Sequence, residues 1–229
     1  MKDCPEWENG FDLLYQNITS NQAPGLEPYE KSVFLTEAEY TVFVGLYNGT
    51  FRNSFEETEE WTSYLSTHVC QEDCALVANA PKLMDKSKVY ELPEDLLFIT
   101  LEMCSVNVEG CGTRQAVVVP VTQDEFWRTH RNPFKRQNAD RVLRLAYGSS
   151  DVLENGLSTS RYSELVSDND IVKYTVRYLR KPDPIIVQDL PDGLTIDGES
   201  KAMTCKLPES LHQAILEEAV RRAKAVWIS

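Results

Sequence analysis

The side chains that could bind a metal ion are concentrated between positions 68 and 74. His68, Cys70 and Cys74 offer three soft ligands, whereas a structural zinc ion usually takes four. A fourth ligand would have to come from a distant position, and the candidates are Cys104, Cys111 and His130. The set is therefore incomplete, and we interpret these residues as local thiols at the end of a helix and predict no metal site.

Catalytic patterns are missing from the rest of the sequence. It contains no phosphate-binding glycine-rich loop, no Gly-x-Ser-x-Gly motif and no pair of histidines spaced for one helix face. The six cysteines are too few and too irregularly spaced for a disulfide scaffold, so we expect free thiols. We predict a protein without catalytic residues or a cofactor. A zinc- or thiol-dependent enzyme remains the alternative.

A basic segment follows position 127 and could contact nucleic acid or protein. It contains, in order, Arg128, Arg131, Lys135, Arg136, Arg141 and Arg144, with Phe134 among them. Basic residues interleaved with an aromatic side chain can bind nucleic acid, but the net charge of −13 repels phosphates at long range. We favour a protein interface that uses Arg128, Arg131, Lys135 and Arg136. A nucleic-acid-associated regulatory protein is the alternative.

The charges are divided unevenly along the chain. Residues 1–127 contain 7 Lys and Arg against 22 Asp and Glu, a net of −15. Residues 128–229 contain 16 against 14, a net of +2. Such a division suits contacts between unlike faces of neighbouring proteins, because complementary charge steers docking and register. Solvated faces that serve solubility are the simpler reading of the same pattern.

Hydrophobic periodicity predicts helices at both ends of the chain. Helical spacing is found over residues 9–18 and 54–68, and another helix is expected from an N-cap at Thr36 to residue 48. The last helix begins near Pro208 and carries Leu211, Ile215, Ala219 and Ala223 on one face. It ends in Trp227 and Ile228, two large apolar residues that we expect to dock on a neighbouring protein.

The middle of the chain has the pattern of a β-sheet. Short runs rich in β-branched residues occupy 96–102, 116–121, 142–147 and 171–179. The turn at 109–112 pairs the first two, and a short helix capped by Thr122 ends before Asn132. Residues 181–184 contain two prolines and are expected to form a loop.

These elements predict an α+β protein with terminal helices and a mainly antiparallel sheet. We expect a mainly helical part over 1–75, a mainly β part over 76–206 and a final helix over 207–229 that packs on the rest, as one integrated domain. No run approaches the roughly 20 apolar residues of a membrane helix. The N-terminus has no apolar stretch after a basic start, so no secretory signal is predicted.

Several segments in this order resemble structural proteins of crAss-like bacteriophages. They are YEKSVFLT at 29–36, TQDEF at 122–126, NPFK at 132–135 and YLRKPDPII at 178–186. The segment CKLPESLH at 205–212, with the Ala-rich helix after it, is similar to the end of neck and tail-tube adaptor proteins of short-tailed phages. The resemblance extends from about residue 26 to the end of the chain.

This resemblance implies an adaptor- or tail-tube-gatekeeper-like fold and a ring beneath the portal protein. Such rings contain about twelve copies, contact other tail ring and muzzle-type proteins, and surround the channel through which DNA and cargo proteins leave. DNA would pass through the channel without sequence-specific binding, and no membrane partner is implied. The protein would be made in the bacterial host cytoplasm and reside in the neck or tail of the virion.

Overall fold

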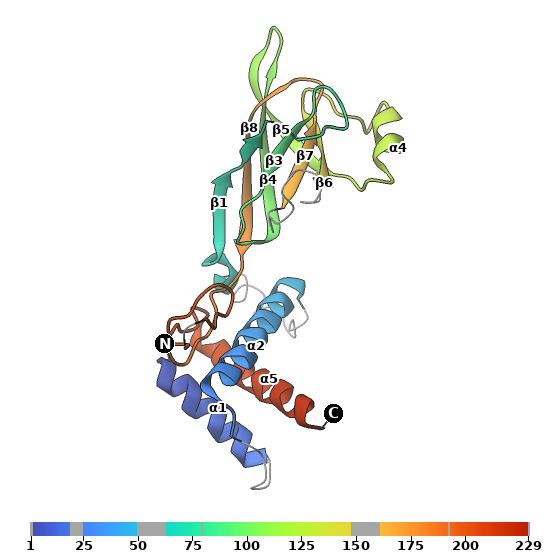
Figure 1. Ribbon diagram of the computed structural model, residues 1–229. Helices are drawn as coiled ribbons and strands as arrows, with labels where there is room; N and C mark the ends of the chain where they lie inside the picture. Colours follow the sequence, from blue (N-terminus) through green and yellow to red (C-terminus); the bar gives the residue numbers. More distant parts are fainter. Residues whose placement is uncertain are drawn as a thin grey trace. The chain divides into compact units, whose positions relative to one another are not determined.

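The computed structural model describes residues 2–18, 25–49, 63–78, 80–147, 161–191 and 193–228. They form two compact units (Figure 1). The helical unit comprises Met1–His68 together with Lys181–Ser229, and the β unit comprises Val69–Arg180. Residues 181–206, which the sequence placed with the sheet, thus belong to the helical unit. The predicted helix over 54–68 lies mostly outside the described residues.

Three helices make up most of the helical unit. They are α1 (Cys4–Ile18), α2 (Pro28–Asn48) and α5 (Glu209–Ile228). Both α1 and α2 pack on α5, and the side chains between them include the fully buried Trp7, Phe11 and Phe43. The predicted apolar face of the last helix is confirmed, because Leu211, Ile215, Ala219 and Ala223 are all buried. None of the helices in the described ranges is long and apolar enough to cross a membrane.

The predicted N-cap at Thr36 is wrong. Helix α2 begins two turns earlier, at Pro28, where the carboxylate of Glu30 accepts a hydrogen bond from the backbone N–H of Glu27 (2.9 Å). Proline at the first helical position and an acidic side chain in the first turn both favour this start. Thr36 instead contacts a distant part of the chain: its hydroxyl oxygen accepts a hydrogen bond from the N–H of Ile185 (3.1 Å).

The segment between the sheet and α5 packs on α2 without regular structure. Residues 181–185 form neither helix nor strand, which confirms the predicted loop. The Ser32 hydroxyl accepts a hydrogen bond from the N–H of Val187 (3.1 Å), and Ile185 and Ile186 are fully buried. Ser32 and Thr36 are one turn apart, so a polar stripe along α2 fixes this segment by its backbone.

The β unit contains eight strands in one sheet with the order β1-β8-β4-β5-β6-β7-β3-β2. In chain order these strands are β1 (Val69–Asp73), β2 (Ala75–Val77), β3 (Lys88–Glu91), β4 (Leu96–Val108), β5 (Gly112–Pro120), β6 (Arg141–Tyr147), β7 (Tyr162–Val166) and β8 (Asp170–Arg180). All pairings are antiparallel except that of β5 with β6. The predicted α+β class, the four predicted strands and the β4–β5 turn are therefore confirmed.

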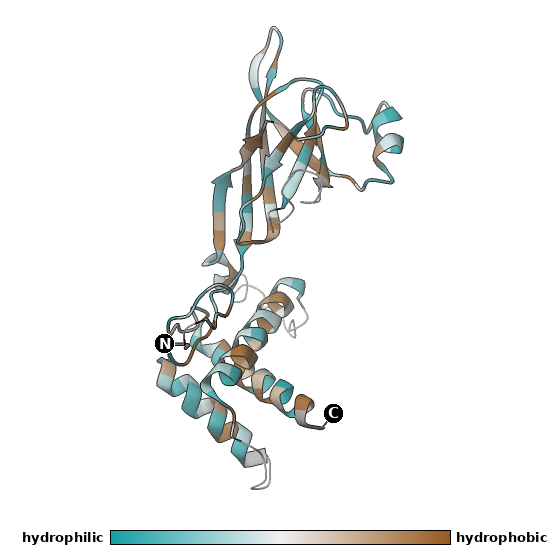
Figure 2. Cartoon of the chain, in the orientation of Figure 1, coloured by the Kyte–Doolittle hydropathy of each residue, from teal (hydrophilic) through white to brown (hydrophobic). Residues whose placement is uncertain are grey.

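The two edges of the sheet are formed by one stretch of chain. β1 pairs with β8 at one edge and β2 pairs with β3 at the other, yet only Cys74 separates them. The sheet must therefore curl nearly into a barrel, because a single extended segment spans both edges. Its interior holds the buried side chains of Cys104, Tyr174 and Tyr178. Figure 2 shows hydrophobic stretches (brown) interspersed with hydrophilic ones (teal) along the strands.

The parallel pair β5–β6 requires a crossover connection, and this connection carries α4 (Phe126–Arg131). The predicted cap at Thr122 is displaced: the N-cap of α4 is Glu125, and the carbonyl of Thr122 accepts a hydrogen bond from the Glu125 N–H in the preceding turn (3.2 Å). The helix ends at Arg131, before Asn132, as predicted. In Figure 1, α4 lies beside β6 and away from β1.

Candidate interaction surface

Helix α4 buries one aromatic side chain against the strands of the β unit. Phe126 is buried in a cluster with Leu143, Leu145 and Val166 of β6 and β7. Its ring contacts that of Trp127 edge to face (centroids 5.2 Å apart), but Trp127 itself is 50% exposed. The two neighbouring aromatic residues therefore differ in role, since the first holds the helix in place and the second faces solvent.

The loop after α4 is held by backbone hydrogen bonds. The side-chain oxygen of Asn132 accepts from the N–H of Phe134 (2.9 Å), and the guanidinium of Arg141 donates to the carbonyl of Phe134 (2.8 Å). The Phe134 ring nevertheless remains 87% exposed. A large apolar side chain on a fixed backbone loses little conformational freedom when a partner covers it.

A buried amide fixes the other end of this loop. Gln137 is 2% exposed, and its side chain hydrogen-bonds Nδ1 of His130 and Oδ1 of Asp168, with the latter contact at 3.1 Å. The His130 ring also stacks on Phe126 (centroids 5.7 Å apart). The last turn of α4, the loop and the turn before β8 are thus connected through side chains within one unit.

The four basic residues predicted to form an interface lie together on α4 and the loop that follows it. Arg128 and Arg131 are on α4, and Lys135 and Arg136 are on the loop, and all four are exposed. Within the described ranges, none of them forms an ion pair. We define the α4 surface by six residues: Trp127, Arg128, Arg131, Phe134, Lys135 and Arg136. The sequence marks its cations, but it does not show that Trp127 is exposed while Phe126 is buried.

The helical unit has an acidic counterpart at the start of α2. The ammonium group of Lys31 is buried between two carboxylates of α1, at 3.0 Å from Glu8 and 2.8 Å from Asp12. Glu27 and Glu30, at the N-terminus of α2, are exposed. Two carboxylates therefore hold the ammonium group, and two more are exposed at the N-terminus of α2. We call Glu8, Asp12, Glu27 and Glu30 the acidic corner.

The two units carry different net charges. The helical unit has 9 Lys and Arg against 20 Asp and Glu, a net of −11, and the β unit has 14 against 16, a net of −2. The fold regroups the charges that the sequence divides at residue 127, because the C-terminal segment joins the N-terminal helices in one unit. The helical unit is therefore strongly acidic, whereas the β unit carries a basic surface.

The sequence matches the profile of a protein family described as phage tail ring protein 3/4, over residues 2–227. The chain belongs to this family. It is 37% identical to Ring protein 3 of Bacteroides phage crAss001 over 225 residues, which cover 95% of this chain and 93% of that protein. It is also 32% identical to Ring protein 4/5 of the same phage, over 97% of this chain and 92% of that protein. The resemblance to crAss-like phage tail proteins is confirmed.

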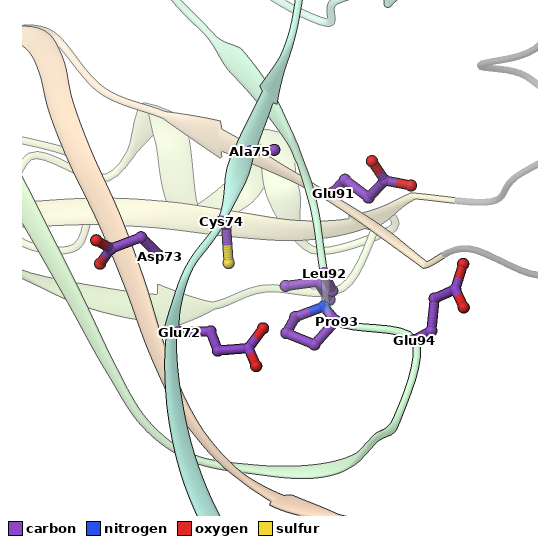
Figure 3. A pocket seen from close by; sticks show the side chains of 8 residues that line it. All are labelled: Glu72, Asp73, Cys74, Ala75, Glu91, Leu92, Pro93 and Glu94. Atoms are coloured by element: carbon purple, nitrogen blue, oxygen red, sulfur yellow. The ribbon is translucent and has the colours of Figure 1, made fainter.

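A second candidate site in this tail ring protein is a cleft of about 300 Å³ where β1 meets β2. Figure 3 shows the thiol of Cys74 beside Leu92 and Pro93, and Glu72 and Glu94 also line the cleft. Burial, with the nearby carboxylates, raises the pKa of the Cys74 thiol to about 12. The thiol therefore stays protonated at neutral pH, and only the thiolate is a good nucleophile or metal ligand.

The residues first considered as metal ligands are not gathered by the fold. His68 belongs to the helical unit, where its buried ring contacts that of Phe43 (centroids 5.2 Å apart). Cys70 and Cys74 belong to the β unit. Among the described residues, no group of three or more His, Cys, Asp or Glu side chains is arranged to hold a metal ion.

Proposed function

We propose that this chain is a structural subunit of a ring in the neck or tail barrel of the virion, beneath the portal protein. Membership of the tail ring family supports the ring and the virion tail. The position beneath the portal, the adaptor-like fold and a ring of about twelve copies rest on the resemblance to neck proteins. In this role the chain links the portal to further tail ring and muzzle-type proteins.

The observation that carries this proposal is the separation of charge between the units. The helical unit has a net charge of −11, and the β unit displays four exposed cations on its α4 surface. Each of these faces can contact the opposite kind of face on a neighbouring copy. A contact between unlike faces is heterologous, and it closes into a ring when the rotation between copies permits. The acidic surplus also suits a channel wall, because it repels DNA and lets DNA slide during ejection.

The end of α5 supplies a second contact in this proposal. The helix includes Trp227 and Ile228, but their side chains lie outside the described part of the chain. We assign them to a groove of the portal or of an adjoining ring, as an aromatic and an aliphatic anchor.

Cryo-electron microscopy of virions that carry this chain tests the proposal directly. We expect density for a closed ring of this protein on the tail axis, next to the portal. Removal of residues 225–229 should leave the fold intact and release the ring from its neighbour. Particles in which the protein is absent from the tail would contradict the ring function, and unchanged attachment after truncation would contradict the role of Trp227 and Ile228.

A further inference from the structure

The α4 surface has the features of a preformed contact site. Phe134 and Trp127 place two exposed aromatic rings beside four cations, and the backbone beneath them is fixed by Asn132 and Arg141. Aromatic and arginine side chains on a rigid support are the residues that dominate binding energy in protein interfaces. The surface is therefore equipped to bind an apolar patch bordered by carboxylates.

The same chain contains carboxylates that complement these cations. In the acidic corner, Lys31 neutralises only part of the charge of Glu8 and Asp12, and Glu27 and Glu30 are exposed at the N-terminus of α2. A large apolar side chain is exposed on the same helix as Glu8 and Asp12, because Leu13 of α1 is 64% exposed.

We propose that the α4 surface of one copy binds the acidic corner of the next copy around the ring, an inference that rests on the proposed ring function. Every copy then uses one face of its β unit and one face of its helical unit. This is a heterologous contact, as ring closure with one kind of interface requires. Complementary charge fixes the register of the contact, and the two aromatic rings exclude water from its centre.

Double-stranded DNA is the alternative occupant of a basic surface, because its phosphates attract Lys and Arg. A protein partner is favoured because the chain is acidic, with a net charge of −13, and a unit of net −11 accompanies the α4 surface in every copy. Long-range repulsion by this charge opposes the approach of phosphates. The following experiment separates the two occupants.

Two charge-reversed variants of the full chain test the contact. The α4 variant combines Arg131→Glu with Lys135→Glu. The corner variant combines Glu27→Lys with Glu30→Gln, because glutamine keeps the acceptor oxygen that Glu30 offers to the backbone N–H of Glu27. Ring formation is measured by mass photometry and negative-stain microscopy, first with the purified chain and then with tail particles that lack it. Each variant alone should form at least about tenfold fewer rings than the wild type.

An equimolar mixture of the two variants should restore rings. In an alternating ring each reversed α4 surface meets a reversed corner, and each native α4 surface meets a native corner. A contact within one copy could not be rescued by mixing. The inference is wrong if wild-type rings form but neither variant is impaired, or if the mixture fails to assemble. If the wild type forms no rings under either condition, the proposed function itself fails.

An uncharged change tests the aromatic contribution. Phe134→Ala should lower ring formation by at least about tenfold while leaving the unfolding midpoint unchanged, because the ring is exposed in the single chain. Val172→Ala, at another exposed apolar position of the β unit, is the matched control and should assemble normally. A salt-sensitive affinity for duplex DNA that the α4 variant abolishes, together with unchanged ring formation, would assign the surface to DNA and overturn the inference.

Discussion

The side chains of Glu39 and Cys205 hydrogen-bond to each other inside the helical unit. Glu39 lies on α2 and is 1% exposed, and its Oε2 atom has no hydrogen-bond partner among the described residues. Burial, with a smaller contribution from Asp183, raises the pKa of Glu39 to about 8. Glu39 continues the stripe of Ser32 and Thr36 that holds segment 181–208 on α2.

The raised pKa makes Glu39 a source of pH-dependent instability. Between the unfolded pKa of 4.5 and the folded pKa of about 8, the folded chain binds one proton more than the unfolded chain. The stability therefore falls as the pH rises through this range. Glu39→Gln should raise the free energy of unfolding by about 1–3 kcal/mol at pH 7, and the gain should vanish near pH 4.5.

Urea denaturation at a series of pH values measures this gain. Glu199→Gln removes an exposed carboxylate of the same unit and is the matched control. A Glu39→Gln variant that is equally stable or less stable than the wild type at pH 7 would show that the carboxylate is charged and stabilised in the folded chain.

Lys31 is a second buried ionisable residue whose contribution to stability can be tested, although the sequence alone would place its charge at the surface. Its ammonium group bridges α1 and α2, so Lys31→Met leaves Glu8 and Asp12 without their cation. We expect a loss of about 1–3 kcal/mol in unfolding free energy, below the cost of a fully buried pair because both carboxylates are about one-third exposed. Adding Glu8→Gln and Asp12→Asn should recover part of it, whereas Lys201→Met, at an exposed position, should have no effect.

Local patterns were sufficient to predict the elements that local interactions determine. The β4–β5 turn has Gly110 and Gly112, both with φ of 76°, and α5 has an apolar stripe of four residues. In contrast, β1 and β2 are the edge strands of the sheet, and their pairing depends on how the sheet closes. The polar sequence Gln71–Asp73 has no pattern that predicts a strand. The start of α2 was misplaced because Thr36 looks like a cap, while its actual partner, Ile185, is far away in the sequence.

The candidate interface was predictable in its charges only. Arg128, Arg131, Lys135 and Arg136 are visible as a basic run, and they do lie together. Which of the neighbouring residues Phe126 and Trp127 is buried depends on the direction of α4 over β6 and β7. The acidic corner depends on the pairing of α1 with α2 through Lys31. Both are tertiary relationships, and no spacing in the sequence reports them.

The thiols should differ widely in their rate of alkylation. Cys111 is exposed in the β4–β5 turn, whereas Cys104 is fully buried inside the barrel, and burial raises the pKa of its thiol to about 12. At pH 7.5 we expect iodoacetamide to modify Cys111 at least about 100-fold faster than Cys104, as followed by mass spectrometry of peptides. Cys74 should also react slowly, and a Cys74 rate equal to that of Cys111 would support the alternative of a thiol-dependent enzyme.

Phe126 and Phe134 distinguish a side chain that stabilises the fold from one that is free to contact a neighbouring copy. Phe126→Ala removes a 1% exposed ring from the cluster with Leu143, Leu145 and Val166, and should cost about 3–5 kcal/mol in unfolding free energy. Because α4 is attached through this ring, the fluorescence of Trp127 should also change. Phe134→Ala should alter neither quantity. If both changes destabilise the chain equally, then Phe134 packs within a single copy and the α4 surface is part of the fold, whereas a difference of several kcal/mol leaves Phe134 free to contact a neighbour.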